Sequence, residues 1–154
     1  SIHDILQEAM DRIDARLKGE HIAGGVDTGF TDLDALTGGL HQSELIILAA
    51  RPSMGKTALA MNIAEHVAIK QKVPTLFVSL EMSSIELADR LLCSMARVNS
   101  HRLRNGTLST TDRQRLVAKA GEISEAPMFV DDSPTRMITE IAAAARRIRR
   151  RHPR

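Results

Sequence analysis

The feature that most constrains the fold is a phosphate-loop pattern, Ala50-Arg51-Pro52-Ser53-Met54-Gly55-Lys56-Thr57. A loop of this kind leaves a strand and opens a helix, because the unpaired N–H groups of the helix N-terminus attract an anion. Residues 44–50 form the continuous apolar run that is typical of a buried parallel strand. Residues 56–70 carry apolar side chains at helical spacing. The sequence therefore predicts a strand, loop and helix in a parallel α/β domain.

The loop residues have distinct expected roles in binding ATP and Mg²⁺. Gly55 lets the backbone approach the phosphates, and Ser53 and Met54 contribute backbone donors. Lys56 reaches the β- and γ-phosphates, and the Thr57 hydroxyl is the predicted metal ligand. Ala50 stands where the pattern usually has glycine, and alanine tolerates fewer backbone conformations. The expected nucleotide-binding set is Ala50, Arg51, Pro52, Ser53, Met54, Gly55, Lys56 and Thr57. The competing interpretation is a chance Gly-Lys-Thr at a helix start.

The rest of the chain alternates between predicted strands and helices. Strands are expected at 75–80 and 128–130, and helices at 110–124 and 135–151. A further helix is expected to begin at Ser83, with an apolar stripe of Leu87, Leu91 and Met95. Ser83 with Glu86 has the spacing of a capping box, and Ser109 or Thr110 begins the following helix. This order implies a parallel sheet flanked by helices, with right-handed crossovers.

Acidic residues follow two of the predicted strands. Glu81 comes directly after strand 75–80, and the phosphate loop leaves the same edge of the sheet, where ligands bind in open parallel sheets. We therefore expect Glu81 and Lys56 to face one pocket as catalytic residues, with Glu81 orienting the attacking water. The alternative is a capping or surface acid. Asp131 and Asp132 end the next strand, where either helps to hold Mg²⁺ or, as the residue types favour, caps the last helix.

The first 41 residues precede this core and contain two expected helical segments. Residues 2–17 carry a single apolar stripe on an otherwise charged helix, and glycines break the pattern after residue 18. A lone helix of this length is marginal in water, so it has to dock on its own domain or on another subunit. We interpret residues 1–18 as a linker helix and 19–154 as the main domain. Thr31 with Asp34 predicts a capping box and one or two helical turns.

Composition excludes several classes of protein. Aromatic residues make up 2% of the chain, which argues against a base-stacking surface for single-stranded nucleic acid. The single cysteine, Cys93, excludes a disulfide framework and is expected to be a small buried hydrophobe. We find no signal peptide and no apolar run of the ~18 residues that a membrane helix needs, which favours a cytoplasmic protein. Six of the last nine residues are arginine, interpreted as a solvated helix end or, alternatively, a phosphate-binding patch.

Four segments, taken together and in order, resemble the ring-forming bacterial replicative DNA helicases of the DnaB type. They are 29–34 (Gly-Phe-Thr-Asp-Leu-Asp), 49–57 (the phosphate loop with its preceding Ala49), 79–83 (Ser-Leu-Glu-Met-Ser) and 129–132 (Phe-Val-Asp-Asp). The insert Arg51-Pro52-Ser53-Met54 is far more specific than a bare phosphate loop, and this family accepts alanine at the first position. The resemblance implies a RecA-like P-loop core, with an N-terminal linker helix that docks on the adjacent subunit.

The resemblance also implies function and partners. It suggests a homohexamer that encircles single-stranded DNA and unwinds the duplex with ATP, with a primase and a helicase loader as partners and a location at the nucleoid. It assigns the phosphate role to Lys56, the metal role to Thr57 and catalysis to Glu81. A complete motor of this type needs a further acidic Mg²⁺-binding strand, DNA-binding loops and an arginine finger. We therefore expect residues 19–154 to be a partial ATPase domain that binds ATP but hydrolyses it poorly by itself.

Two other functions stay open. The chain could belong to a different RecA-like ATPase, of repair or signalling, although the Arg-Pro-Ser-Met insert speaks against that. It could also be a non-catalytic module that binds nucleotide or partner helices without turnover.

Overall fold

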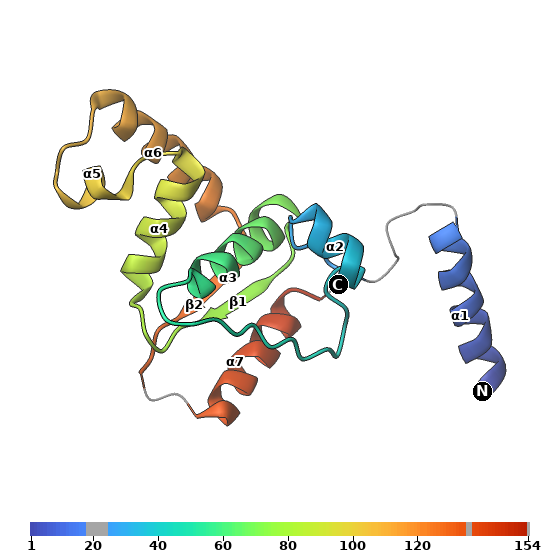
Figure 1. Cartoon of the computed structure of the whole chain (residues 1–154). Helices are drawn as coiled ribbons and strands as arrows, with labels where there is room; N and C mark the ends of the chain where they lie inside the picture. The colour runs from blue at the N-terminus through green and yellow to red at the C-terminus, as the bar shows by residue number, and fades with distance from the viewer. Residues whose placement is uncertain (18–24, 135–136, 154) are drawn as a thin grey trace. The chain divides into compact units, whose positions relative to one another are not determined.

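The computed structural model describes residues 1–17, 25–134 and 137–153 (Figure 1). The chain divides into two compact units, 1–56 and 57–154. None of the helices in the described residues is both long enough and apolar enough to span a bilayer.

The first unit contains helices α1 (Ile2–Leu17) and α2 (Thr31–Thr37). Helix α1 agrees with the helix expected at 2–17, while residue 18, which ends the predicted linker segment, lies outside the described residues. The apolar stripe of α1 is exposed from Ile2 to Ile13, with Ile2 70% and Ile5 63% exposed. After α1, an isolated antiparallel bridge joins Val26 and Leu40 through two backbone hydrogen bonds of 2.8 Å. This bridge closes a loop around α2.

The capping box expected at Thr31 and Asp34 is wrong in its partners. Thr31 is the first residue inside α2, and Phe30 stands at the N-cap without a side-chain bond. The Asp34 carboxylate instead accepts hydrogen bonds from the backbone N–H and the hydroxyl of Thr28, at 2.9 and 2.7 Å. Thr28 is buried, and its hydroxyl also accepts the N–H of Phe30. The carboxylate therefore closes the turn before the helix, because a buried hydroxyl there needs a partner.

The strand expected at 44–50 is also absent from the structure. These residues have no regular secondary structure, and all of them are exposed; Leu45 is 88% and Ile47 82% exposed. A central parallel strand needs main-chain partners as well as apolar side chains. Within the described part of the chain, no strand pairs with 44–50. The apolar pattern of residues 44–50 is typical of a strand, but a strand also needs a neighbouring backbone to bond to.

The second unit holds the two strands and most helices. Its elements are α3 (Lys56–Glu65), the π-helical turn η1 (His66–Lys70), β1 (Thr75–Val78), α4 (Ser84–Ala96), α5 (Ser100–Arg104), α6 (Thr110–Ser124), β2 (Met128–Asp131) and α7 (Ile138–Arg151). The single helix expected at 56–70 is thus α3 continued by η1. The sequence did not predict α5. The start expected for α7 at 135 lies outside the described residues, and the helix is described from Ile138.

Strands β1 and β2 pair in parallel, with Thr75 opposite Met128 and Phe77 opposite Val130. Alternate residues of a strand face opposite sides, and both sides are covered. Phe77 and Met128 pack against the buried cluster beneath α3 and α4, whereas α7 packs against β1 from the other side. The Phe129 ring lies 5.5 Å from the ring of His152, just after α7. This is the expected parallel sheet flanked by helices.

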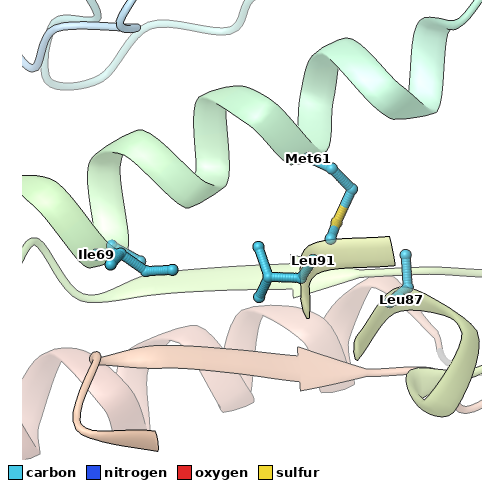
Figure 2. Close-up of a cluster of buried hydrophobic side chains, with 5 residues drawn as sticks. Met61, Ile69, Leu87 and Leu91 are labelled. Atoms are coloured by element: carbon cyan, nitrogen blue, oxygen red, sulfur yellow. The ribbon is translucent and has the colours of Figure 1, made fainter. Parts of the chain in front are cut away.

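The core of this unit is aliphatic, as an aromatic-poor sequence requires. Met61 from α3, Ile69 from η1, and Leu87 and Leu91 from α4 point toward one another in Figure 2, and all are buried. Leu87 lies near the N-terminus of α4. The capping box predicted from Ser83 and Glu86 is present there, with Ser83 Oγ accepting from Glu86 N–H and Glu86 Oε2 from Ser83 N–H. The equivalent box of α6 uses Ser109 and Asp112.

Candidate functional site: a phosphate loop and a sheet edge

The phosphate loop forms a tight, exposed turn that runs directly into α3. Met54 N–H donates to the Arg51 carbonyl at 3.3 Å. Ser53 has φ of 64° and Gly55 has φ of 89°, both in the left-handed region. The helix then begins at Lys56, as the sequence predicted. Left-handed residues in a tight turn are a feature of the backbone nests that bind anions. The Met54 N–H, predicted as a phosphate donor, is engaged within the loop in this structure.

The structure explains both the required glycine and the unusual alanine. A Cβ placed on Gly55 would meet nothing within 4 Å, so glycine is needed there for its positive φ and not for space. Ala50 is not among the residues with positive φ. The first position therefore makes no conformational demand that alanine cannot meet, which agrees with the phosphate-loop interpretation.

The residues at the start of α3 fit a nucleoside triphosphate and its metal ion. The first turn of α3 carries no acidic side chain that would repel an anion. Lys56 is exposed, and among the described residues no hydrogen bond or ion pair engages its ammonium group. Thr57 follows, half-buried, with a hydroxyl of the kind that ligates Mg²⁺ beside phosphates. The open space over Gly55 leaves room for phosphate oxygens.

Glu81 lies in the short connection between β1 and α4. The strand ends at Val78, two residues earlier than expected, although Ser79 N–H still donates to the Asp131 carbonyl at 2.9 Å. The buried Ser79 hydroxyl accepts from Met82 N–H at 3.0 Å, which turns the chain sharply. Glu81, between them, is exposed, and no described residue bonds to its carboxylate. The turn thus presents this carboxylate to solvent.

Glu81 and Thr57 lie at the same end of the second unit. The helical stretch from Thr57 to Lys70 joins β1 through only residues 71–74, so its C-terminal end adjoins the start of β1. Its N-terminal end therefore adjoins the end of β1, and Figure 2 shows the helix running opposite to the strands. The predicted metal ligand and the predicted catalytic carboxylate thus share the carboxyl edge of the sheet, as ligand sites in open α/β sheets do.

The two aspartates at the end of β2 accept hydrogen bonds from backbone N–H groups. Asp131 Oδ1 accepts from Ser133 N–H at 3.2 Å. Asp132 Oδ2 accepts from Ser84 N–H at 2.7 Å, so it binds the first residue of α4. The predicted start of the last helix, at 135, lies outside the described residues, so capping of that helix stays a prediction. The bond from Ser84 N–H lowers the pKa of the Asp132 carboxyl below its ordinary value.

Other predicted groups play no part at this edge. Cys93 is buried, and desolvation raises the pKa of its thiol, as expected of a structural cysteine. In the described ranges, no three acidic, histidine or cysteine side chains gather as a metal site. Exposed arginines line α7 without an ion pair to any described residue: Arg146, Arg147, Arg149, Arg150 and Arg151. Both interpretations of this arginine run, solvated helix end and phosphate patch, stay predictions.

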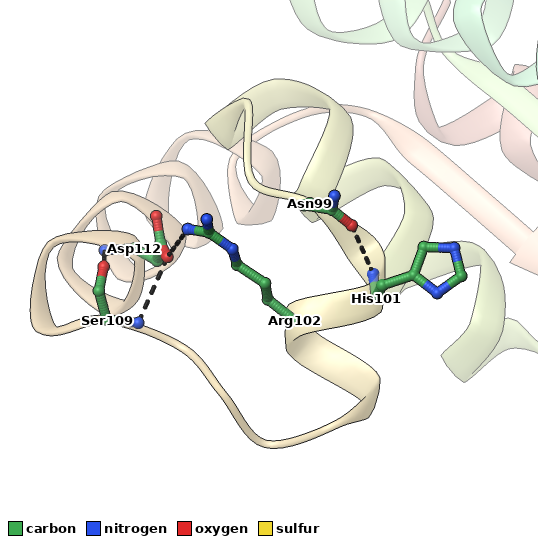
Figure 3. A network of polar contacts seen from close by, with 5 residues as sticks. All are labelled: Asn99, His101, Arg102, Ser109 and Asp112. Carbon is green, nitrogen blue, oxygen red and sulfur yellow. Dashed lines mark hydrogen bonds and ion pairs between the residues drawn. The ribbon is translucent and has the colours of Figure 1, made fainter.

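The sequence missed the polar network that joins α5 to α6 (Figure 3). Asp112 is buried to 7% exposure and accepts from Ser109 N–H and from Arg102 at 3.3 and 3.4 Å. Asn99 Oδ1 accepts from His101 N–H at 2.8 Å and so caps α5. The signal was present, because Asn99 is a preferred cap and Asn105-Gly106 follows the helix directly. A five-residue helix is too short for hydrophobic periodicity to reveal.

Comparison with known proteins shows that the chain is similar to replicative DNA helicases. It is 45% identical over 143 residues to the replicative DNA helicase DnaB of Leifsonia xyli, covering 93% of this chain and 31% of that protein. It is 41% identical to the DnaB protein of Geobacillus stearothermophilus, covering 97% of this chain and 33% of that one. The chain therefore spans about a third of the length of the curated relatives it matches.

Solved structures agree with the fold. One solved ATPase domain superposes with a TM-score of 0.90 at 28% identity, covering 99% of this chain and 53% of that chain. A DnaB-like replicative helicase, solved in a study of its interactions with primase, gives a TM-score of 0.84 at 28% identity, with 99% of this chain and 36% of that chain covered. The family model of the DnaB-like helicase C-terminal domain matches residues 25–153, and the chain belongs to this family.

Proposed function

We propose that this chain is the nucleotide-binding part of an ATP-driven replicative DNA helicase motor. The observation that carries the proposal is the phosphate loop itself. Its positive-φ turn opens onto the start of α3, and the exposed Lys56 ammonium has no partner among the described residues. The family match over residues 25–153 supports the same function.

In this proposal the chain's own groups divide the work of binding and hydrolysis. The N–H groups of the loop and of the first turn of α3 bind the phosphates of ATP, and Lys56 neutralises the β- and γ-phosphate oxygens. Thr57 Oγ1 holds Mg²⁺, which supplies charge neutralisation on the phosphates when bound. Glu81 orients the attacking water and accepts its proton. Water can reach Glu81 because the side chain is exposed at the edge where α3 begins.

The proposed partners follow from the relatives. A ring helicase acts on single-stranded DNA as a homohexamer, and the exposed apolar stripe of α1 suits the role of a linker helix (1–18) that docks on the next subunit. One similar solved structure is that of a DnaB-like replicative helicase and its interactions with primase. We propose a primase and a helicase loader as partners of this chain as well. This function would place the chain in the cytoplasm, at the nucleoid. Since the relatives are about three times as long, we propose that the 154 residues bind ATP but hydrolyse it slowly by themselves.

The two competing functions make different predictions for turnover. In the full-length protein that carries this chain, single-stranded DNA should stimulate ATP hydrolysis if the protein is a helicase. A signalling ATPase would hydrolyse ATP without that stimulation. A non-catalytic module would bind nucleotide without turnover at any concentration of DNA.

The first test is titration of the chain with a fluorescent ATP analogue and Mg²⁺. Wild-type chain should bind saturably, and Lys56→Ala should weaken binding by about tenfold or more, about 1.4 kcal/mol. The reason is that Lys56 occupies the lysine position of the phosphate-loop pattern, whose ammonium group binds the β- and γ-phosphates. Binding is read from fluorescence anisotropy.

The matched control is Arg115→Ala, which removes the same charge from an exposed position on α6. It should leave the dissociation constant unchanged. Equal loss of binding in both variants would mean that the analogue senses net charge and not the phosphate loop. Absence of binding to the wild type would show that these residues form no nucleotide site without further chain.

A further inference from the structure

The six residues from Ser79 to Ser84 carry the proposed catalytic carboxylate, and both ends of this segment are fixed. At its start, Ser79 N–H donates to the Asp131 carbonyl at 2.9 Å, which extends the β1–β2 ladder by one bond. In its middle, Met82 N–H donates to Ser79 Oγ at 3.0 Å. The Met82 side chain packs against the buried cluster. Glu81 therefore sits on an anchored turn, while its carboxylate bonds to no described residue.

The other end of the segment is the N-terminus of α4, whose first N–H groups lack partners within the helix. The capping box satisfies two of the N–H groups there: Ser83 Oγ accepts from Glu86 N–H, and Glu86 Oε2 accepts from Ser83 N–H. It leaves the N–H groups of Ser84 and Ile85. Asp132 Oδ2 accepts the bond from Ser84 N–H at 2.7 Å from 48 residues further along the chain. A carboxylate there also interacts favourably with the positive end of the α4 dipole.

We propose that Asp132 is a positioning residue for Glu81. Its carboxylate ties the start of α4 to the end of β2, so that the turn bearing Glu81 is fixed at both ends against the sheet edge. This inference rests on the proposed role of Glu81 in ATP hydrolysis. Asp132 does not touch the nucleotide. It acts through the segment 79–84, and a displacement of a catalytic group by about 1 Å is enough to cost up to about a hundredfold in rate.

The bonding pattern predicts which substitution is tolerated. Asp132→Asn retains a side-chain oxygen that accepts the Ser84 N–H, whereas Asp132→Ala removes the acceptor. An exposed N–H can bind water instead, so the alanine variant should fold. What it loses is the fixed geometry of the turn. The phosphate loop, which binds ATP through other elements, is unaffected.

The test measures ATP hydrolysis by the full-length protein that carries this chain. Asp132→Ala should lower kcat by about tenfold or more with KM for ATP unchanged. Asp132→Asn should retain most of the wild-type kcat. Asp89→Ala, which removes an exposed carboxylate from α4, is the control and should leave both constants unchanged. Hydrogen exchange of the peptide containing 79–84 should accelerate in Asp132→Ala only.

The decisive measurement combines Asp132→Ala with Glu81→Gln in a single-turnover assay. If Asp132 acts through Glu81, adding Asp132→Ala to Glu81→Gln produces no further loss, because coupled residues are non-additive. A full second loss of about tenfold, or a wild-type kcat for Asp132→Ala alone, would overturn the inference while leaving the proposed function standing. Wild-type turnover of Glu81→Gln alone would instead remove the proposed catalytic role of Glu81, and with it this inference, whereas the proposed nucleotide binding is tested separately by Lys56→Ala.

Discussion

At the scale of single residues, the chain separates glycines that the backbone requires from glycines that it merely tolerates. Gly55 and Gly106 have φ of 89° and 67°, a region that side chains with a Cβ disfavour. Gly121 lies inside α6 with a negative φ. At each of these positions an added Cβ would meet nothing within 4 Å. Backbone conformation alone should therefore decide the effect of alanine.

Two substitutions test this directly through the free energy of unfolding. Gly121→Ala should stabilise the chain by about 0.5–1 kcal/mol, because glycine is a poor helix former. Gly106→Ala should destabilise it by about 1–2 kcal/mol, because alanine is disfavoured in the left-handed region. Both values come from urea unfolding monitored by circular dichroism. A stabilising Gly106→Ala would show that the turn after α5 is not left-handed.

At the scale of elements, the junction of α5 and α6 depends on one carboxylate. The pKa of the Asp112 carboxyl lies below the ordinary value of about 3.8. The main cause is the hydrogen bond with the Ser109 side chain, and smaller contributions come from the Ser109 backbone N–H and from Arg102. A carboxyl whose pKa is lower in the folded state stabilises the fold above the unfolded pKa. That contribution is lost as the pH falls through the folded pKa.

Asp112→Asn should therefore destabilise the chain at neutral pH and match the wild type in strong acid. The difference in unfolding free energy between the two proteins should shrink as the pH falls below about 3.8. Denaturant unfolding across a pH series gives this difference. Asp89→Asn, at an exposed position of α4, serves as the control and should show no such trend. A constant difference at all pH values would mean that Asp112 acts through packing and not through its charge.

At the scale of the whole molecule, apolar side chains are exposed in places where they need cover. The stripe of α1 is such a surface, and Ile5 on it is 63% exposed. A helix that buries nothing is marginal by itself, so the proposed docking of α1 on a second copy would stabilise both. We expect the chain to self-associate as its concentration rises.

Sedimentation velocity tests this surface. Ile5→Asp should raise the dissociation constant of the self-associated form by about tenfold or more, because burial of one isoleucine contributes about 1.5–3 kcal/mol. Gln7→Asp introduces the same charge two residues away, off the apolar stripe, and should have little effect. Monomers at every concentration of wild-type chain, or equal effects of both variants, would contradict a role for this stripe in association.

The sequence by itself determined the local structure wherever a short-range signal exists. The phosphate loop opening α3, the capping boxes at Ser83 and Ser109, the positions of strands β1 and β2 and the buried Cys93 were all predicted from residues close together in the chain. Glu81 was expected at the end of a strand and lies three residues beyond β1, at the edge of the sheet where α3 begins. Its catalytic role and that of Lys56 stay predictions. The resemblance to the helicase family was also visible in short motifs, because each motif consists of residues that are adjacent in the sequence.

Tertiary structure alone decided the pairings between distant residues. Asp132 binds the first residue of α4, 48 residues away in the sequence, and Asp34 closes the turn at Thr28 and not a box with Thr31. A carboxylate accepts from whichever N–H or hydroxyl the fold brings within reach. The apolar run 44–50 looks like a buried strand, yet a strand exists only where a neighbouring backbone supplies hydrogen bonds. Sequence pattern specifies which side chains suit a strand or a cap, whereas the partner in each case is a property of three-dimensional packing.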